Sequence, residues 1–505
     1  MQVNPDIDDF RAAHGSGRAQ IVWTRLVADL ETPVSAMLKL ARGRPNSFLL
    51  ESVEGGANRG RYSFIGLNPD LIWRCKGDAA EVNRNPEADP LGFEAHGEGT
   101  LDSLRRIVED SKIDLPEGMP PMAAGLVGYM GYDMVRLMER IPDDNEEILH
   151  VPDGLFVRPT IIAIFDTIED TVTIVTPVRP VEGADAETAY REASERLFQV
   201  VADFDRAVPH EAPAPPDSHE MPVPTSNMTE AEFHQMVERG KEYILAGDVF
   251  QVVLSQRFEM PFTLPPFALY RSLRRLNPSP FLFFLDFGEF SIVGSSPEIL
   301  VRLRKGIVTI RPVAGTRRRG VNAVEDQELA ADLLSDPKEL AEHLMLLDLG
   351  RNDVGRVAKV GTVNVAEKMV IEYYSHVMHI ASHVDGEIAD DYDALSALVA
   401  GFPAGTVSGA PKVRAMEIID ELESDRRSVY SGCIGYFGAD GDMDTAIALR
   451  TAVVKDDTIY VQAGGGIVAD SEPAAEREES WNKARALMRA AEDAVRYATR
   501  GNEPG

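Results

Sequence analysis

Residues 281–310 read FLFFLDFGEFSIVGSSPEILVRLRKGIVTI. Three short runs in this stretch, Phe281–Leu285, Phe290–Gly294 and Gly306–Ile310, are rich in β-branched and aromatic side chains. Turn-forming residues bound the runs, which is typical of β-strands. The stretch therefore predicts consecutive strands of one sheet.

The same pattern returns at Cys433–Phe437, Ala446–Val454 and Thr458–Ala463. Short turns, Ala439–Asp442 and Lys455–Asp457, link these neighbours. Such turns favour antiparallel pairing over the long crossovers that parallel strands need. Together with the helical segments described below, these strands predict an α+β fold.

A proline-rich stretch interrupts the chain. Residues 208–227 contain few large apolar side chains and predict a linker or a long surface loop. Thr229 and Glu232 follow with the spacing of a capping box, which opens a helix expected to reach about Ala246.

The stretch separates two expected regions. The N-terminal region, 1–207, mixes strand-like runs at 160–165 and 172–176 with helical spacing over 187–207. The second region, 228–505, carries the strands described above and every chemically distinctive motif below.

Composition limits the classes of function. The chain has 505 residues, 44% of them hydrophobic, and a formal net charge of −31. This charge argues against a broad nucleic-acid or anionic-membrane surface. Two distant cysteines, Cys75 and Cys433, favour a reducing compartment over a disulfide framework. The N-terminus lacks the pattern of an export signal, and no apolar run approaches the roughly 20 residues of a membrane span. We therefore expect a cytoplasmic protein.

Residues 402–412, FPAGTVSGAPK, form a loop of small side chains before a helix expected at 413–421. Glycines allow backbone N–H groups to approach a ligand, and prolines fix the ends of the loop. The loop could enclose a small anion, although an ordinary turn before a helix is as good an interpretation of the loop alone.

Two acidic pairs repeat one arrangement. Glu339 and Glu342 follow Asp336 at a predicted helix start, and Glu476 and Glu479 lie at another. Residues three apart share a helix face. One such pair is usually a solvated surface, but two pairs converging from two helices suit Mg²⁺, which prefers oxygen ligands.

These motifs together resemble the large subunits (component I) of the anthranilate synthases, within the chorismate-utilising enzyme family. The resemblance covers nearly the whole chain. Its motifs are Gly294–Glu298, Arg311–Arg317, Ala341–Asp353, Val377–Ile380, Pro403–Lys412, Ala448–Thr451 and Gln462–Val468. It implies an α+β sandwich of two packed antiparallel sheets flanked by helices, with the active site in a cleft between the sheets.

The resemblance also implies chemical roles. Glu342 and Glu479 match the Mg²⁺ ligands, with Glu339 and Glu476 completing an acidic shell around the ion, which binds the ring carboxylate of chorismate. Glu298 matches the general acid that protonates the departing C4 hydroxyl, and burial or nearby carboxylates would keep its carboxyl group protonated.

Other positions match the second step and the substrate contacts. His379 matches the histidine associated with loss of pyruvate from aminodeoxyisochorismate, and Thr406 lies with the catalytic residues. Tyr430 and Arg450 match contacts to the enolpyruvyl carboxylate. The remaining matched substrate contacts are Gly315, Thr316, Gly464, Gly465, Gly466 and Lys483.

Two positions distinguish members of the family. Isochorismate and salicylate synthases place a lysine base where this chain has Gln251, and aminodeoxychorismate synthases use a nucleophilic lysine where it has Ala314. Both differences favour the formation of anthranilate, the first committed step of tryptophan biosynthesis. The alternatives are those relatives, or a non-catalytic tryptophan-binding regulator.

The resemblance extends to regulation and partners. Glu51 and Ser52 match a tryptophan-binding segment, and Pro280, Phe281 and Leu282 match the segment that faces it. Feedback inhibition by L-tryptophan is the implied role, and a plain packing interface is the alternative. Neither cysteine lies in a glutaminase nucleophile turn, so ammonia is expected from a separate glutamine amidotransferase small subunit (component II) in a heterotetramer.

Overall fold

The computed structural model describes residues 1–505 except 53–59, 98, 181–182, 210–222, 375–376 and 501–505. Most of the expected linker lies outside the described residues, so the division into 1–207 and 228–505 stays a prediction. Val53 and Glu54 of the predicted tryptophan segment also lie outside them, as does His376, a neighbour of His379.

The strands of the described chain are, in order, β1 (Gln20–Val27), β2 (Ser47–Glu51), β3 (Tyr62–Lys76), β4 (Ala79–Asn83), β5 (Glu94–Ala95), β6 (Gly125–Met130), β7 (Gly154–Asp166), β8 (Thr171–Val178), β9 (Thr225–Ser226), β10 (Gln251–Pro261), β11 (Phe281–Asp286), β12 (Ser291–Ser296), β13 (Ile299–Arg304), β14 (Ile307–Ile310), β15 (Val313–Arg318), β16 (Asn364–Tyr373), β17 (Val377–Glu387), β18 (Gly409–Ala410), β19 (Cys433–Gly438), β20 (Met443–Ile447), β21 (Thr451–Lys455) and β22 (Thr458–Ile467).

The helices of the described chain are α1 (Ile7–Gly15), α2 (Pro33–Leu40), α3 (Thr100–Asp110), the 3₁₀ helix η1 (Tyr132–Leu137), α4 (Ala186–Phe204), α5 (Glu230–Ala246), α6 (Pro266–Leu276), α7 (Ala323–Ser335), α8 (Pro337–Gly355), α9 (Ala394–Gly401), α10 (Gly405–Ser408), α11 (Lys412–Leu422) and α12 (Pro473–Arg500).

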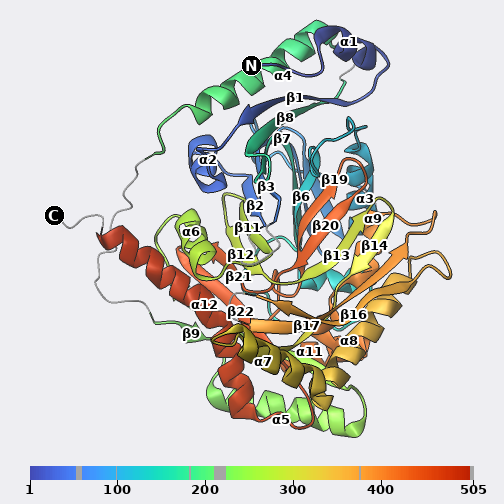
Figure 1. The fold of residues 1–505 in the computed structure, drawn as a ribbon, viewed down its shortest axis with the longest axis vertical. Helices are drawn as coiled ribbons and strands as arrows, with labels where there is room; N and C mark the ends of the chain where they lie inside the picture. The colour runs from blue at the N-terminus through green and yellow to red at the C-terminus, as the bar shows by residue number, and fades with distance from the viewer. Residues whose placement is uncertain (53–59, 98, 181–182, 210–222, 375–376, 501–505) are drawn as a thin grey trace.

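Every ladder between these strands is antiparallel, as the short turns predicted. The long strands β3 and β7 pair with each other, and two runs of strands lead away from them. One run is β2, β11, β12, β21, β22 and β10, and the other is β6, β19, β20, β13, β14 and β17. Mixed helices and antiparallel sheet make the fold α+β (Figure 1).

Alternation along the strands divides the core into layers. Leu282 and Phe284 of β11 pack in a cluster that includes side chains of α6 and α12. Phe283 and Leu285 point to the opposite face, because successive side chains of a strand alternate. There they join a second cluster that takes residues from both runs, among them Phe48, Phe64, Tyr129, Ile434 and Tyr436.

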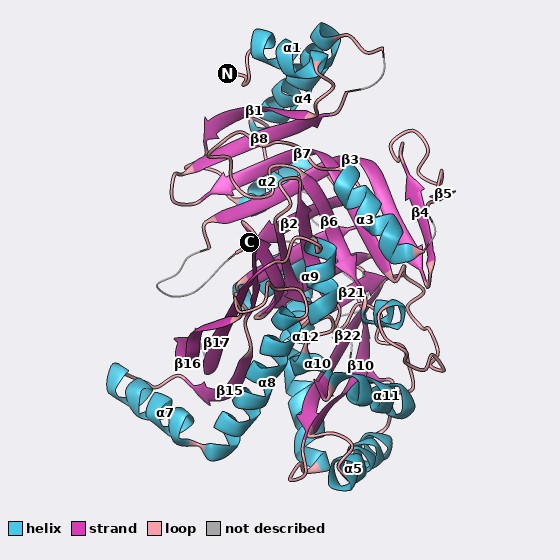
Figure 2. Ribbon diagram, turned by 90° about the vertical axis from the view of Figure 1, so that its right-hand side faces the viewer, coloured by secondary structure: helices cyan, strands magenta, loops and turns pink. Residues whose placement is uncertain are grey.

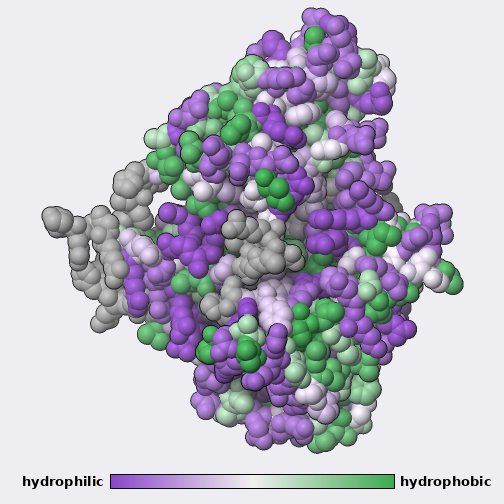
Figure 3. Space-filling view, viewed as in Figure 1, coloured by the Kyte–Doolittle hydropathy of each residue, from purple (hydrophilic) through white to green (hydrophobic). Residues whose placement is uncertain are grey.

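The helices cover the outer faces of the strands. In Figure 1, α12 runs beside α6 and β22. In Figure 2, α8 runs beside β15 and β17. Residues that are mainly hydrophilic cover the face in Figure 3, with hydrophobic residues gathered over its lower part. Among the described residues, we find no helix that combines the length and apolar character of a membrane span.

The helix starts confirm the local predictions. Thr229 and Glu232 form the expected capping box, with Thr229 N donating to Glu232 Oε2 at 2.7 Å and Glu232 N donating to Thr229 Oγ1 at 3.3 Å. Asp336 caps α8 by accepting from Lys338 N at 3.0 Å. These hydrogen bonds join residues two or three apart, so the sequence alone contains the information.

The prediction of one strand over 446–454 is wrong. Strand β20 ends at Ile447 and β21 begins at Thr451. Between them Arg450 adopts a left-handed backbone with φ +47°, and its carbonyl accepts from Ser295 N at 3.1 Å. The loop 402–412 also differs from the prediction, because it contains the short helix α10 and the strand β18, which pairs with β10.

Candidate active site

Glu298 lies in the short connection between β12 and β13, and the residue is only 8% exposed. Thr406, from α10, donates its hydroxyl to Glu298 Oε1 at 3.1 Å. Burial raises the pKa of Glu298 to about 8, against the opposing effects of the Thr406 hydrogen bond and the charge of Arg311. Glu298 is therefore largely protonated at neutral pH, the state that a general acid needs.

His379, on β17, is neutral and oriented. Its Nδ1 lies 2.9 Å from the Gly315 carbonyl oxygen and 3.1 Å from Thr316 Oγ1. A carbonyl oxygen only accepts, so Nδ1 carries the proton and Nε2 keeps a free lone pair. Burial lowers the pKa of His379, and the nearby Arg450 and Arg311 act in the same direction. The arrangement gives an imidazole that can accept a proton.

Carboxylates from two helices approach one another. Glu342, on α8, accepts from Gln251 Nε2 at 3.3 Å. Burial raises the pKa of Glu342, and the charges of Glu339 and Glu479 raise it further. Repulsion between α8 and α12 carboxylates shows that these helices bring them into electrostatic range of one another.

The second pair lies against the glycine run. A Cβ atom added to Gly465 would lie 2.9 Å from Glu476 Oε2 and 3.5 Å from Glu479 Oε1. A side chain at this position would therefore have to displace the Glu476 carboxylate. Burial raises the pKa of Glu476, and the charge of Glu479 adds to this effect.

The four carboxylates are not equivalent. Arg317 pairs with Glu339 at 2.8 Å, and Lys483 pairs with Glu479 at 2.7 Å. Glu342 and Glu476 form no ion pair with a described residue.

The donor set bears on the expected Mg²⁺. Within the part of the chain that the structure describes, no three histidine, cysteine, aspartate or glutamate side chains form a ready-made metal site. Mg²⁺ is commonly held by one or two protein carboxylates, and waters and an anionic substrate complete its coordination. Glu342 and Glu479, which repel each other across the two helices, fit that requirement.

Arg450 presents a mostly buried guanidinium. It makes no side-chain hydrogen bond or ion pair with any described residue, and burial lowers its pKa. A cation without a partner in such a position suits an anionic ligand. Tyr430 is buried, which raises the pKa of its hydroxyl, and Lys483 Nζ donates to the Gly464 carbonyl at 2.8 Å.

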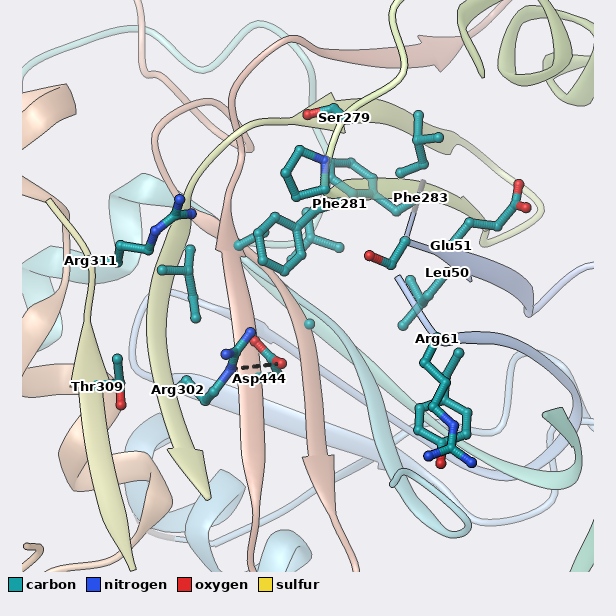
Figure 4. A pocket seen from close by; sticks show the side chains of 18 of the residues that line it. Leu50, Glu51, Arg61, Ser279, Phe281, Phe283, Arg302, Thr309, Arg311 and Asp444 are labelled. Atoms are coloured by element: carbon teal, nitrogen blue, oxygen red, sulfur yellow. Dashed lines mark hydrogen bonds and ion pairs between the residues drawn. The ribbon is translucent and has the colours of Figure 1, made fainter. Parts of the chain in front are cut away.

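The predicted tryptophan residues lie elsewhere. Glu51, Ser52, Pro280, Phe281 and Leu282 line a cavity of about 1030 Å³, shown in Figure 4. The residues that line this cavity do not include the predicted catalytic residues. The structure therefore separates the predicted site residues into two groups.

The carboxylate of Glu51 is not free to bind a ligand unaided. Arg274 donates to its two oxygens at 2.7 and 2.9 Å, and the Tyr270 hydroxyl also donates to it.

Sequence reasoning missed two arginines. Arg317 neutralises Glu339, and Arg427 forms a buried pair with Glu423 beside the loop of Thr406. The four-residue spacing of Glu423 and Arg427 is a signal for an ion pair on a helix surface. Nothing local indicates that this pair is buried.

Comparison with known proteins places the chain among characterised enzymes. Residues 52–489 match the family model described as chorismate binding enzyme. The chain is 57% identical to anthranilate synthase component 1 of Cereibacter sphaeroides over 98% of each chain, and 46% identical to that of Aquifex aeolicus over 97% of this chain and 98% of the relative.

Solved structures agree. Anthranilate synthase component I from Streptococcus pneumoniae aligns with a TM-score of 0.74 and 36% identity, covering 92% of this chain and 99% of that one. The menaquinone-specific isochorismate synthase MenF of Escherichia coli aligns with a TM-score of 0.68 at 18% identity, covering 96% and 98%, which shows a shared fold.

The raised pKa of Glu298 predicts a pH-dependent cost to stability. Between its ordinary pKa of 4.5 and about 8, the folded chain keeps this proton while the unfolded chain releases it, so the unfolding free energy falls as pH rises. Glu298→Gln removes that loss. We expect the unfolding free energy of the variant minus that of the wild type to increase from pH 5 to pH 8, measured by urea denaturation. Glu289→Gln, in the exposed β11–β12 turn, is the control, and a flat difference for Glu298→Gln would contradict the prediction.

Proposed function

This chain belongs to the chorismate-binding enzyme family, among the anthranilate synthase component 1 proteins, and we propose that it converts chorismate and ammonia to anthranilate and pyruvate. The reaction is the first committed step of tryptophan biosynthesis and passes through aminodeoxyisochorismate. The observation that carries the proposal is the buried Glu298, held by Thr406 in a chain so similar to component 1 relatives.

Glu298 is the acid of the first step. Ammonia forms a bond to C2 of chorismate while the C4 hydroxyl departs. Glu298 gives its proton to that hydroxyl, which leaves as water. Its burial supports this role, because a solvated carboxylate would have lost the proton at neutral pH.

His379 is the base of the second step. The ring proton at C2 moves to the imidazole as the bond between C3 and the enolpyruvyl oxygen breaks. The departing enolpyruvate takes up a proton at its methylene carbon and is released as pyruvate. The ring becomes aromatic. The hydrogen bond from Nδ1 to Gly315 supports the role, because it leaves Nε2 as the proton acceptor.

Charge complementarity holds the substrate. Arg450 and Tyr430 bind the enolpyruvyl carboxylate, and the unpaired guanidinium of Arg450 supports this assignment. Thr316, Lys483 and the backbone at 464–466 contribute further contacts, and Gly315 orients His379 beside them.

Glu342 and Glu479 would hold Mg²⁺, and Glu339 and Glu476 would complete the acidic surroundings. The bound ion would supply Lewis-acid chemistry for the ring carboxylate of chorismate.

Water-adding and lysine-nucleophile relatives are the weaker assignments. Gln251 stands where an isochorismate synthase needs a lysine base, and its amide donates to Glu342. Ala314 lacks any nucleophile. A non-catalytic regulator has no use for a buried acid facing a threonine donor.

Inhibition by L-tryptophan at the cavity of Ser52 and Phe281 is part of the proposal. The lining by both predicted segments supports it.

Component 2, a glutamine amidotransferase, supplies ammonia in a heterotetramer. Cys75 and Cys433 are buried free thiols, which supports the cytoplasm as the compartment. The two runs of strands form two packed sheets. The hydrophobic cluster that includes Phe48 of one run and Ile434 of the other supports this packing.

Incubation of the purified chain with chorismate, Mg²⁺ and an ammonium salt tests the reaction. We expect anthranilate fluorescence and an equal amount of pyruvate. Glutamine in place of ammonium should give neither, because ammonia release requires component 2. A hydroxylated product, or no turnover with ammonium, would reject the proposal.

The metal assignment predicts a difference between neighbouring residues of α12. Glu479→Gln removes one carboxylate ligand, so the Mg²⁺ concentration for half-maximal rate should rise by at least ~10-fold. Calorimetric titration of Mg²⁺ with chorismate present should show the same weakening. Glu478→Gln, also at an exposed position of this helix, is the control. Equal Mg²⁺ requirements in the two variants would contradict the assignment.

The cavity predicts a variant that escapes inhibition. Phe281→Ala removes aromatic surface from the lining, so the tryptophan concentration for half inhibition should rise about 10-fold or more. We expect kcat/KM for chorismate to stay within about 2-fold, because the residue is outside the catalytic group. Phe198→Ala, an exposed residue of α4, is the control. Unchanged inhibition of Phe281→Ala would show that tryptophan does not bind in this cavity.

A further inference from the structure

The guanidinium of Arg427 is one of the largest fully buried side chains, at 2% exposure. Its Nε and Nη2 donate to the two carboxylate oxygens of Glu423 at 2.9 and 2.6 Å. Glu423 is buried as well, and its Oε1 also accepts from the backbone N and the hydroxyl of Ser255, each at 2.8 Å. Burial of such a pair is costly unless its hydrogen bonds are satisfied, and here they are.

The remaining donors of Arg427 reach the backbone of two separate segments. Nη1 donates to the Val407 carbonyl at 2.7 Å, and Nη2 donates to the Val253 carbonyl at 2.6 Å. Val407 directly follows Thr406. Val253 lies on β10 opposite Gly466 of the glycine run. One planar group therefore fixes two elements of the candidate active site.

A third element packs on the face of the guanidinium. Its central carbon lies 5.5 Å from the ring centroid of Tyr430 and 4.9 Å from that of Tyr132. These distances are within the range of cation–π contacts. Tyr430 is a proposed substrate contact, so Arg427 contacts three parts of the site without being exposed to the substrate.

The far end of the loop has its own anchor. Lys412 Nζ donates to Asp353 Oδ2 at 2.6 Å and to the Gly401 carbonyl at 3.2 Å. Lys412 thus fixes the end of the loop to α8, and the bond from Arg427 to Val407 fixes its middle. That middle contact lies one residue after Thr406.

We propose that Arg427 is a positioning residue, which acts through Val407 to hold the Thr406 hydroxyl against Glu298. The proposal rests on the proposed function for its kinetic consequences. Arginine is required because the position needs a planar fork that serves a carboxylate and two carbonyls at once. A lysine keeps the charge but presents one compact head that cannot reach all of these acceptors.

Arg427→Lys should lower kcat for ammonium-dependent anthranilate formation about 10- to 100-fold, because small misplacements in an active site are costly. KM for chorismate should change less than about 3-fold. Arg426→Lys is the matched control, since Arg426 pairs at the surface with Asp143. If Arg427→Lys keeps wild-type kcat, or loses activity only in proportion to unfolded protein, the proposal is wrong.

A double-mutant cycle with Thr406→Val tests the route of the effect. If Arg427 acts through Thr406, the double variant should be no slower than the slower single variant. Additive losses would show that Arg427 acts elsewhere. If Arg427→Lys folds poorly, Glu423→Gln is a second test, because Glu423 holds the Arg427 guanidinium. This variant should show the same lack of additivity with Thr406→Val.

A titration provides a readout that a purely structural role would not change. The Thr406 hydrogen bond opposes the raised pKa of Glu298, so its loss raises that pKa further. The alkaline limb of the kcat/KM profile should therefore move to higher pH in Arg427→Lys and in Thr406→Val. The same shift should extend the fall of unfolding free energy to higher pH. That measurement needs no turnover, so an inactive wild type would reject the proposed function while this proposal is still tested.

Discussion

The ladder between β10 and β22 is the constraint on which the candidate site depends. Its register places Val253, Leu254 and Ser255 opposite Gly466, Gly465 and Gly464. Because Gly465 lacks a side chain, the Glu476 and Glu479 carboxylates of α12 can lie close to the strand. Strand β10 begins one residue before this ladder, at Gln251, whose side-chain amide donates to Glu342 of α8. Carboxylates of both α8 and α12 therefore lie against this one pair of strands.

Charge is balanced locally in this acidic protein. The chain has a formal net charge of −31, yet it would bind a substrate with two carboxylates. Arg450 keeps an unpaired cation for one of them. Glu342 has no ion-pair partner among the described residues, and the charges of Glu339 and Glu479 raise its pKa, so a cation bound near it would relieve this repulsion. Global charge therefore says little about the ligand, whereas the pairing state of single residues is informative.

Features made by near neighbours could be predicted from the sequence. The capping box of Thr229 and Glu232, the Asp336 cap and the turn at 439–442 all depend on residues a few positions apart. The aromatic and apolar run at 281–285 predicted the strand β11, whereas its two faces became visible only in the structure. Each of these signals is local, so tertiary structure was not needed to read it.

Features made by distant residues could not be predicted. The break at Arg450 depends on the amide of Ser295, which lies far away in sequence. The role of Arg427 depends on carbonyls 20 and 174 residues away. The identities of the site residues came from the resemblance. Composition and spacing alone leave Glu298 and His379 as ordinary polar residues.

The two groups of site residues are separate but mechanically connected. In the β11–β12 ladder, Phe281 pairs with Ser296 and Leu282 with Ser295, and Glu298 follows two residues later. Ser279 also donates its hydroxyl to the Ser296 carbonyl at 2.6 Å. A ligand in the cavity that displaces 279–282 must therefore move the strand leading to Glu298, the proposed general acid, or break these bonds. Inhibition requires only that tryptophan prefer a position of this hairpin in which Glu298 is misaligned.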